Sequence, residues 1–192
     1  MTRSPFWGRM AVLAGVGLLA TLLVAAPGVG PAGATLAGGQ ARWSRDVTGM
    51  FLWGSPVIAD VDGDGSADVV AGSINGQVYA VDANGADLAG WPAAAVVSGG
   101  ATAVASSPAV GDLDGDGANE VVVGAGALEV TNQHGGLVVF NGNGARRCAF
   151  QPLDVFRIWG GGGPDGFSEP VFNAPAIGDV DGDGVNDIVA GS

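Results

Sequence analysis

The sequence predicts an all-β fold built from repeated four-stranded antiparallel units, and three observations lead to this prediction. Glycine is abundant, with 36 Gly among 192 residues, and only 14% of the residues are charged. This composition is typical of a turn-rich β protein rather than a helical one. An Asp-rich stretch occurs three times, and short runs of β-branched residues flank every copy. Such runs, preceded by Pro and ended by Gly, are typical of strands on either side of a loop.

The three Asp-rich stretches share one spacing of acidic residues. They cover residues 60–68, 112–120 and 179–187, with acids at positions 1, 3, 5 and 9 and Gly at positions 4 and 6. Carboxylates at alternate positions of a tight loop converge on one point, and glycine permits the positive φ that the loop needs. Two like charges about 4 Å apart repel by roughly 4 kcal/mol at an effective dielectric constant of about 20. A hard divalent cation removes this repulsion, and Ca²⁺ suits a flexible site with many oxygen ligands better than Mg²⁺.

Two alternatives to this calcium loop are less consistent with the sequence. A single Asp- and Gly-rich run is often a solvated turn, but three copies with one spacing and similar flanks favour calcium binding. An EF-hand needs a bidentate Glu at loop position 12 and a helix on each side. Position 12 is Ala71, Val123 and Ala190 in the three copies, and the flanks resemble strands. A helical dockerin-type loop is excluded on the same ground.

Residues 1–34 are predicted to be a signal peptide. Two arginines precede an apolar run at residues 11–26, and Ala32-Gly33-Ala34 forms an A-x-A cleavage site. The apolar run is shorter than the roughly 20 residues that a membrane-spanning helix needs. We therefore expect cleavage near Ala34-Thr35, secretion to the extracellular space, and no stable membrane insertion after cleavage. An uncleaved N-terminal anchor is the alternative.

The rest of the chain divides around the three loops. Residues 35–54 are expected to be a lead-in segment, in which residues 41–47 complete a neighbouring sheet as a strand. Residues 55–105 form a first repeat, residues 106–173 a second repeat with loop insertions, and residues 174–192 a third repeat that is cut off after its second strand.

The first repeat is predicted to be a meander of four strands, near residues 55–60, 68–72, 77–82 and 86–91. Asn75-Gly76 and Asn84-Gly85 connect these strands and are favoured pairs for two-residue hairpin turns. Trp91 ends the unit and is expected to anchor the packing between sheets.

The second repeat aligns with the first but carries insertions at residues 125–136 and 151–169. Insertions at fixed places in a repeat lie on one face, which is often a binding face. A cluster of Trp159, Asp165, Phe167 and Glu169 there would favour ligand binding. His134, in the first insertion, is expected to be a solvated loop residue.

Charge and cysteine content restrict the partners. The formal net charge is −12, and twelve of the 19 acidic residues lie in the three loops, four in each. Such a surface argues against nucleic acid or an anionic membrane as partner. Cys148 is the only cysteine, so it forms no internal disulfide and is either buried or paired with another molecule; we favour burial.

The repeated unit resembles a known family. Ser-Pro or Ala-Pro, a short strand, D-x-D-G-D-G-x-x-D/E and an apolar strand ending in Gly resemble the FG-GAP repeat, also called the VCBS-type repeat, of integrin α-subunit propellers and secreted bacterial proteins. The resemblance covers about residues 53–192, although only Trp53-Gly54 represents the Phe-Gly half of the motif. It implies a β-propeller-like array with one blade per repeat, about two and a half blades in all, and one structural Ca²⁺ in each Asp-rich loop.

The resemblance also implies a ligand set for up to three Ca²⁺ ions. The side-chain ligands would be Asp60, Asp62, Asp64 and Asp68 in the first loop, Asp112, Asp114, Asp116 and Glu120 in the second, and Asp179, Asp181, Asp183 and Asp187 in the third. The backbone carbonyls of Ser66, Ala118 and Val185 would each add one oxygen.

The number of repeats is too small for a closed propeller. Propellers close with about 4–8 blades, so a chain with fewer repeats is a fragment of a longer product, an open array completed by self-association through its blade edges, or an unstable piece. We expect a fragment.

The expected function is a secreted calcium-binding module that serves in extracellular binding or adhesion to a protein or glycan. One alternative is the propeller portion of a secreted polysaccharide-active lyase or hydrolase, and another is a structural spacer. No Ser/His/Asp or Cys/His set is visible, and the paired acids are assigned to metal, so no enzymatic activity is expected of this chain.

Overall fold

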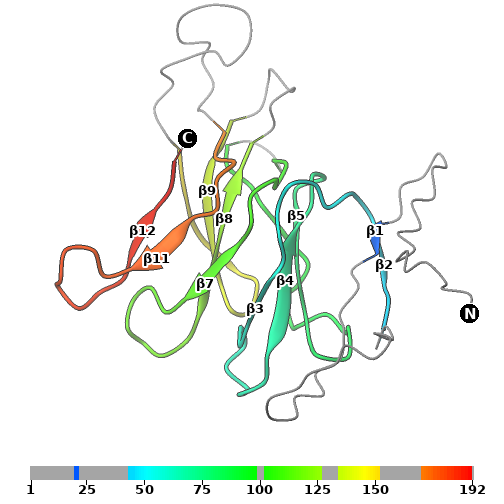
Figure 1. The fold of residues 1–192 in the computed structure, drawn as a ribbon, viewed down its shortest axis with the longest axis horizontal. Helices are drawn as coiled ribbons and strands as arrows, with labels where there is room; N and C mark the ends of the chain where they lie inside the picture. The colour runs from blue at the N-terminus through cyan, green and yellow to red at the C-terminus, as the bar shows by residue number, and fades with distance from the viewer. Residues whose placement is uncertain (1–19, 22–42, 99–101, 127–133, 152–169, 192) are drawn as a thin grey trace, which may run out of the picture.

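The computed structural model describes residues 20–21, 43–98, 102–126, 134–151 and 170–191 (Figure 1). Within these ranges the regular structure is entirely β-strand, in two four-stranded and two two-stranded sheets, and every strand pair is antiparallel. The predicted all-β fold with four-stranded antiparallel sheets is therefore confirmed. No stretch of the described residues forms a helix with the length and apolar character needed to cross a membrane.

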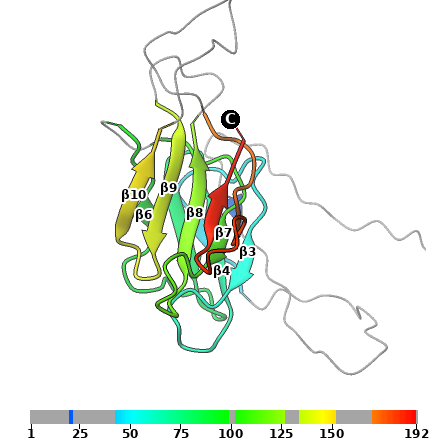
Figure 2. The ribbon, with the colours of Figure 1, turned by 90° about the vertical axis from the view of Figure 1, so that its left-hand side faces the viewer.

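The sheets follow one another along the chain. The first has the order β3 (Val57–Ala59), β4 (Asp68–Gly72), β5 (Gln77–Val81) and β6 (Ala93–Ala94). The second has the order β7 (Ala109–Gly111), β8 (Glu120–Ala125), β9 (Gly136–Asn141) and β10 (Arg146–Phe150), seen side by side in Figure 2. The third consists of β11 (Ala176–Gly178) and β12 (Asp187–Val189), and β1 (Ala20–Thr21) pairs with β2 (Asp46–Val47).

One register recurs where each Asp-rich loop begins. The last pairs before the loops are Ala59 with Asp68, Gly111 with Glu120, and Gly178 with Asp187. The acid at loop position 9 is thus the first residue of the second strand in each sheet. Each loop therefore connects the first two strands of its sheet, as the sequence predicts.

The sheets are arranged as successive blades. The first strands of the sheets are neighbours: β3 lies next to β7, and β7 lies next to β11. The remaining strands of each sheet follow on the side away from these first strands (Figure 1). The second strands β4 and β8 are buried along their whole length. Their near-continuous apolar sequences fit strands that are covered on both faces.

The core lies between the first two sheets and includes Trp91. This side chain is 6% exposed, its ring centroid lies 5.5 Å from that of Phe140 on β9, and its indole N–H donates to the carbonyl of Gly142 over 2.8 Å. The prediction that Trp91 anchors one sheet to the next is confirmed.

The fourth strand of the first sheet lies later in the chain than predicted. After one bridge between Val81 and Asp87, the Trp91 N–H donates to the Leu88 carbonyl at 3.1 Å and closes a turn. This turn interrupts the predicted strand at 86–91, and pairing with β5 resumes only at β6.

The predicted two-residue hairpin turns are wrong in detail. Gly76 and Gly85 have φ values of 83° each, but their Asn neighbours are not among the described residues with positive φ. A type I′ turn needs positive φ at both central residues. The hydrogen bonds from Gly76 N–H to Ser73 and from Gly85 N–H to Asp82 instead define longer loops that end in a glycine bulge.

The described residues of the lead-in segment, 43–54, add no strand to a four-stranded sheet. The strand β2 of this segment pairs with β1 instead, and the segment contacts the first repeat through side chains and through a backbone hydrogen bond of 3.0 Å from Ile74 N–H to the Met50 carbonyl. The Trp43 indole N–H donates to the Ala83 carbonyl over 2.9 Å, and Arg45 forms an ion pair with Asp87. β1 lies inside the predicted signal peptide; the remainder of that segment lies outside the described residues, so its cleavage stays a prediction.

Cys148 is exposed, so the expectation of burial is wrong. It lies on β10, the outer strand of its sheet, whose residues 146–148 are all exposed. Trp159, Asp165, Phe167 and Glu169 lie outside the described residues, and so does most of the insertion at 151–169.

Candidate metal sites

In all three Asp-rich loops, backbone N–H groups surround the carboxylate at position 1. One oxygen of this Asp accepts from the Gly at position 4, at 2.7–2.9 Å, and the other accepts from the Gly at position 6, at 2.9–3.0 Å. Both glycines have positive φ in each loop, between 76° and 90°. The glycines at positions 4 and 6 are thus needed for the chain to fold back around the acid. The central residues are Asp60, Asp112 and Asp179.

The acid at position 9 is held in the same way in each loop. It accepts a hydrogen bond from the backbone N–H of position 2, over 2.9 Å at Asp68, 2.9 Å at Glu120 and 3.0 Å at Asp187. Asp68 and Glu120 are each only 2% exposed. The carboxylate therefore fixes the loop to the start of the second strand.

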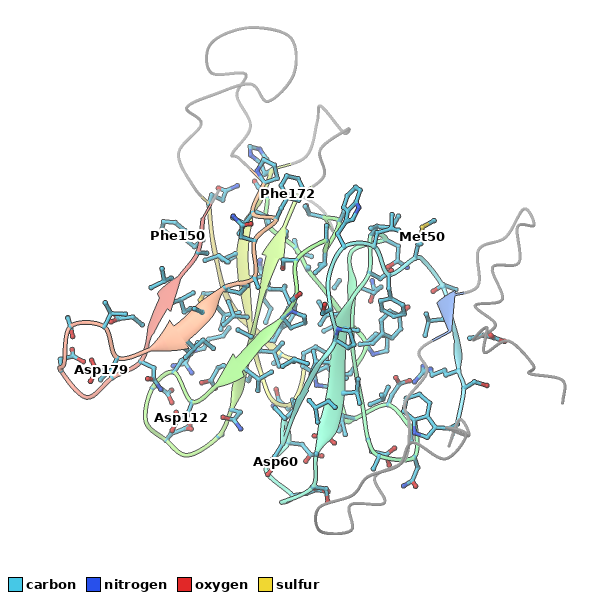
Figure 3. The ribbon with its side chains drawn as sticks, viewed as in Figure 1. Met50, Asp60, Asp112, Phe150, Phe172 and Asp179 are labelled. Atoms are coloured by element: carbon cyan, nitrogen blue, oxygen red, sulfur yellow. The ribbon has the colours of Figure 1, made fainter. Side chains whose placement is uncertain are left out.

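Three carboxylates of each loop converge. The acids at positions 1, 3 and 9 each offer one oxygen, and these oxygens lie within 4.8 Å of one another. Oxygens on opposite sides of a Ca²⁺ ion, each about 2.4 Å from it, are about 4.8 Å apart. The three oxygens are thus close enough together to be ligands of one Ca²⁺ ion, and Figure 3 shows the three loops at one end of the molecule. The groups are Asp60, Asp62 and Asp68; Asp112, Asp114 and Glu120; and Asp179, Asp181 and Asp187.

The predicted ligands at position 5 are not among the converging groups. One carboxylate oxygen of Asp64, Asp116 and Asp183 accepts instead from the backbone N–H of position 7, at 2.7–2.8 Å. The structure thus assembles three of the four predicted carboxylates in each loop. The role of the position 7 carbonyls, those of Ser66, Ala118 and Val185, stays a prediction.

The electrostatics of the first loop favour a cation. Burial raises the pKa of Asp68 above its ordinary value, the hydrogen bond from Val61 opposes this shift, and the charges of Asp62, Asp64 and Asp60 raise the pKa further. A positive charge among these carboxylates would reverse the contribution of the neighbouring acids. The arrangement is therefore suited to binding a cation rather than to accepting another anion.

Adjacent loops are joined by an asparagine at position 8. The side-chain amide of Asn119, in the second loop, donates to the carbonyl of Asp60 in the first over 2.7 Å, and Asn186 donates to Asp112 over the same distance. The first loop has Ala67 at position 8, which cannot donate. Sequence reasoning missed this link, although the recurrence of Asn in two copies was a visible signal.

The second loop differs from the other two because an arginine contacts its acids. Arg147 on β10 donates from Nη2 to Asp114 Oδ2 over 2.6 Å, and its Nη1 lies 3.5 Å from Glu120 Oε1. The hydrogen bond from Arg147 is the main cause that lowers the pKa of Asp114. Among the described residues, the acids of the first and third loops form no such ion pair.

A cavity of about 520 Å³ opens between the first and second loops. Its lining includes Asp62 from the first loop, Asp116 from the second, Asn141 at the end of β9, and Arg147. The Oδ1 atom of Asn141 is buried without a hydrogen-bond partner among the described residues. The second loop is thus accessible from this cavity.

Comparison with known proteins places the central part of the chain in a repeat class. Residues 60–123 match the family described as FG-GAP-like repeat, a stretch that contains the first two Asp-rich loops and the strands between them. Residues 60–123 therefore resemble an FG-GAP-like repeat, as the motif predicts.

No curated protein matches the chain. Among solved structures, the biofilm matrix protein Bap1 of V. cholerae aligns at 18% identity with a TM-score of 0.44, over 72% of this chain and 22% of that one. The chain thus spans about a fifth of the length of Bap1.

Proposed function

We propose that this chain is an extracellular repeat module whose Asp-rich loops bind Ca²⁺ as a structural ion. The observation that supports this most directly is the convergence of the carboxylates at positions 1, 3 and 9, which recurs with one spacing in three loops. A set of hard oxygen ligands in a flexible loop suits Ca²⁺, whereas Mg²⁺ demands stricter geometry and retains its water.

The ion would stabilise the junction between the first two strands of each sheet. It would offset the repulsion among the converging acids, one of which is the first residue of the second strand. Because Asn119 and Asn186 join each loop to its predecessor, an ordered loop would also support its neighbour. We expect affinities on the order of 10⁻⁴–10⁻³ M, as in other extracellular calcium modules.

We further propose that the module binds an extracellular protein or glycan through the end opposite the metal loops. Figure 3 shows Phe150 and Phe172 at that end, away from Asp60, Asp112 and Asp179. Phe150 is 66% exposed and directly precedes the insertion at 151–169. Exposed aromatic side chains are enriched where proteins bind partners. The acids that could serve in catalysis are assigned to metal, so we propose a binding role rather than an enzymatic one.

Thermal unfolding of the purified chain, measured after chelation and then with added CaCl₂ or MgCl₂, tests the calcium proposal. Millimolar Ca²⁺ should raise the melting temperature, and the same concentration of Mg²⁺ should raise it much less. An unchanged melting temperature together with no heat of Ca²⁺ binding in calorimetry would reject the proposal.

The binding role has its own test. Glycan arrays and pull-downs from extracellular fractions, with Phe150→Ser compared with the wild type, should show a partner that the variant binds more weakly. Equal binding by the two proteins would show that this end of the molecule is not the contact surface.

A further inference from the structure

We propose that Arg147 takes the place of the metal ion at the second Asp-rich loop, so that the first and third loops bind Ca²⁺ and the second stays without it at concentrations that fill the others. This inference rests on the proposed calcium function and refines it. It predicts two bound ions rather than three.

The guanidinium contacts two of the three acids that converge in the second loop. Asp114 and Glu120 occupy positions 3 and 9, and Arg147 approaches them at 2.6 Å and 3.5 Å. A Ca²⁺ ion would need the same carboxylates. Ion binding would therefore have to break a charge-assisted hydrogen bond and bring a second positive charge close to the guanidinium.

Arg147 also competes from a fixed position. Its strand is held in the second sheet, so the guanidinium remains near the loop whether or not an ion is present, and its effective concentration is high. A Ca²⁺ ion with a dissociation constant on the order of 10⁻⁴–10⁻³ M is a weak competitor. The adjoining cavity opens to the second loop, so competition for the carboxylates rather than access would limit ion binding there.

A local irregularity in β10 explains why Arg147 and not its neighbour reaches the loop. The pairing of β10 with β9 shifts register between Arg146 and Cys148, so Arg147 lies at a bulge. Bulges change the direction of side chains. Arg146 instead donates from Nη1 to the carbonyl of Val96 over 2.9 Å.

The corresponding positions in the other units hold no cation. When Asn143-Gly144 is aligned with Asn84-Gly85, Arg147 corresponds to Leu88, which is 8% exposed and belongs to the core cluster. Residues 170–191, which contain the third loop, include no Lys or Arg. Within the described chain, the arginine is thus specific to the second loop.

Arg147→Gln tests the proposal, with Arg146→Gln as the matched control. Both variants remove one positive charge from adjacent positions of β10, but only the first frees Asp114 and Glu120. Calorimetric titration and native mass spectrometry with Ca²⁺ alone should count two ions for the wild type and for Arg146→Gln, and three for Arg147→Gln. Affinity at the second loop should increase at least tenfold in Arg147→Gln.

Two further variants assign the ions. Asp62→Asn, at position 3 of the first loop, should reduce the wild-type count from two to one. Adding Asp114→Asn to Arg147→Gln should return the count from three to two. Circular dichroism confirms that each variant retains its β structure.

Three results would overturn the inference. Three ions of similar affinity in the wild type, or a count for Arg147→Gln that equals that of Arg146→Gln, would reject the role of Arg147 and leave the calcium function intact. No bound ion in the wild type or in Arg147→Gln would reject the calcium function and this inference together.

Discussion

The side-chain amide of Asn186 donates a hydrogen bond of 2.7 Å to the backbone carbonyl of Asp112, which lies one repeat earlier. Asn119 makes the same bond to Asp60. In both cases position 8 of one Asp-rich loop holds position 1 of the preceding loop, and the side chain at position 1 belongs to a converging acid group. The conformations of adjacent loops are thus linked directly, and neighbouring interactions of this kind dominate the energetics of repeat proteins.

Asn119→Ala should weaken Ca²⁺ binding at the first loop although Asn119 is outside that loop. Loss of the hydrogen bond should also cost about 1 kcal/mol in the free energy of unfolding, a typical net value for one hydrogen bond. Chemical denaturation with and without Ca²⁺, combined with calorimetry, measures both effects.

Asn84→Ala is the control for that substitution. Within the part of the chain that the structure describes, its side-chain amide donates a hydrogen bond to Asp82 alone, in the same turn, over 3.4 Å. The link between loops would be disproved if Asn119→Ala and Asn84→Ala changed Ca²⁺ affinity at the first loop equally.

Trp91→Ala should destabilise the chain by about 3–5 kcal/mol, the usual cost of truncating a large buried aromatic residue. The loss is large because Trp91 contacts Phe140 and donates to the Gly142 carbonyl across the junction between sheets. Trp91→Phe should cost less, since it retains most of the apolar contact and loses the hydrogen bond. Urea denaturation measures the differences.

Trp53→Ala serves as the comparison, because Trp53 is 73% exposed. Surface substitutions usually change stability by less than about 0.5 kcal/mol. Similar losses for Trp53→Ala and Trp91→Ala would contradict the assignment of Trp91 as the anchor.

Some features of the fold could be predicted from the sequence, and others could not. The three loops, their flanking strands and the convergence of three of the four predicted acids in each loop were predictable because the same spacing is repeated and local geometry determines it. The position of the last strand in the first sheet was not predictable, because the turn at Leu88–Trp91 depends on the packing of Trp91 against the second sheet. The exposure of Cys148 depends equally on the position of β10 at a sheet edge.

The contact of Arg147 with the second Asp-rich loop could not be predicted from the sequence either. Nothing in the local sequence distinguishes it from Arg146, because the bulge that selects between them arises from strand pairing. Its contact with Asp114 joins residues 33 positions apart. The repeated features of the loops were therefore predictable, whereas this contact between a loop and a distant strand was not.

Asp82 should make the stability of the first hairpin depend on pH. Its carboxylate accepts hydrogen bonds from the backbone N–H groups of Ala86 and Asn84, each over 2.8 Å, and these bonds lower its pKa. A group whose pKa is lower in the folded state contributes stability above its unfolded pKa of about 3.9. This contribution disappears as the pH falls through the folded pKa.

Asp82→Asn isolates the charge, because the amide retains an acceptor oxygen but does not titrate. The wild type should be more stable than Asp82→Asn at pH 6, and the difference should shrink when the pH is lowered toward 3. Unfolding at both pH values in the presence of a chelator measures this. A difference that is the same at the two values would show that the charge of Asp82 does not contribute.

Asp68→Asn should have opposite effects with and without Ca²⁺. Asp68 is 2% exposed, and burial together with the nearby acids raises its pKa, so its ionised form is disfavoured when no cation is present. The amide can still accept the hydrogen bond from Val61 but removes the buried charge. In a chelator the variant should therefore be at least as stable as the wild type.

With saturating Ca²⁺ the wild type should be more stable than Asp68→Asn. The wild type gains the free energy of Ca²⁺ binding at the first loop, whereas the variant has a neutral amide in place of one charged carboxylate ligand. Melting temperatures of the two proteins in chelator and in 10 mM CaCl₂ (about tenfold or more above the expected dissociation constant) test this reversal. Asp46→Asn, on β2 and outside the loops, should leave the melting temperature unchanged in both conditions. If Asp68→Asn is less stable by the same amount in both conditions, Asp68 serves only to hold the backbone of the loop and does not act as a ligand of the ion.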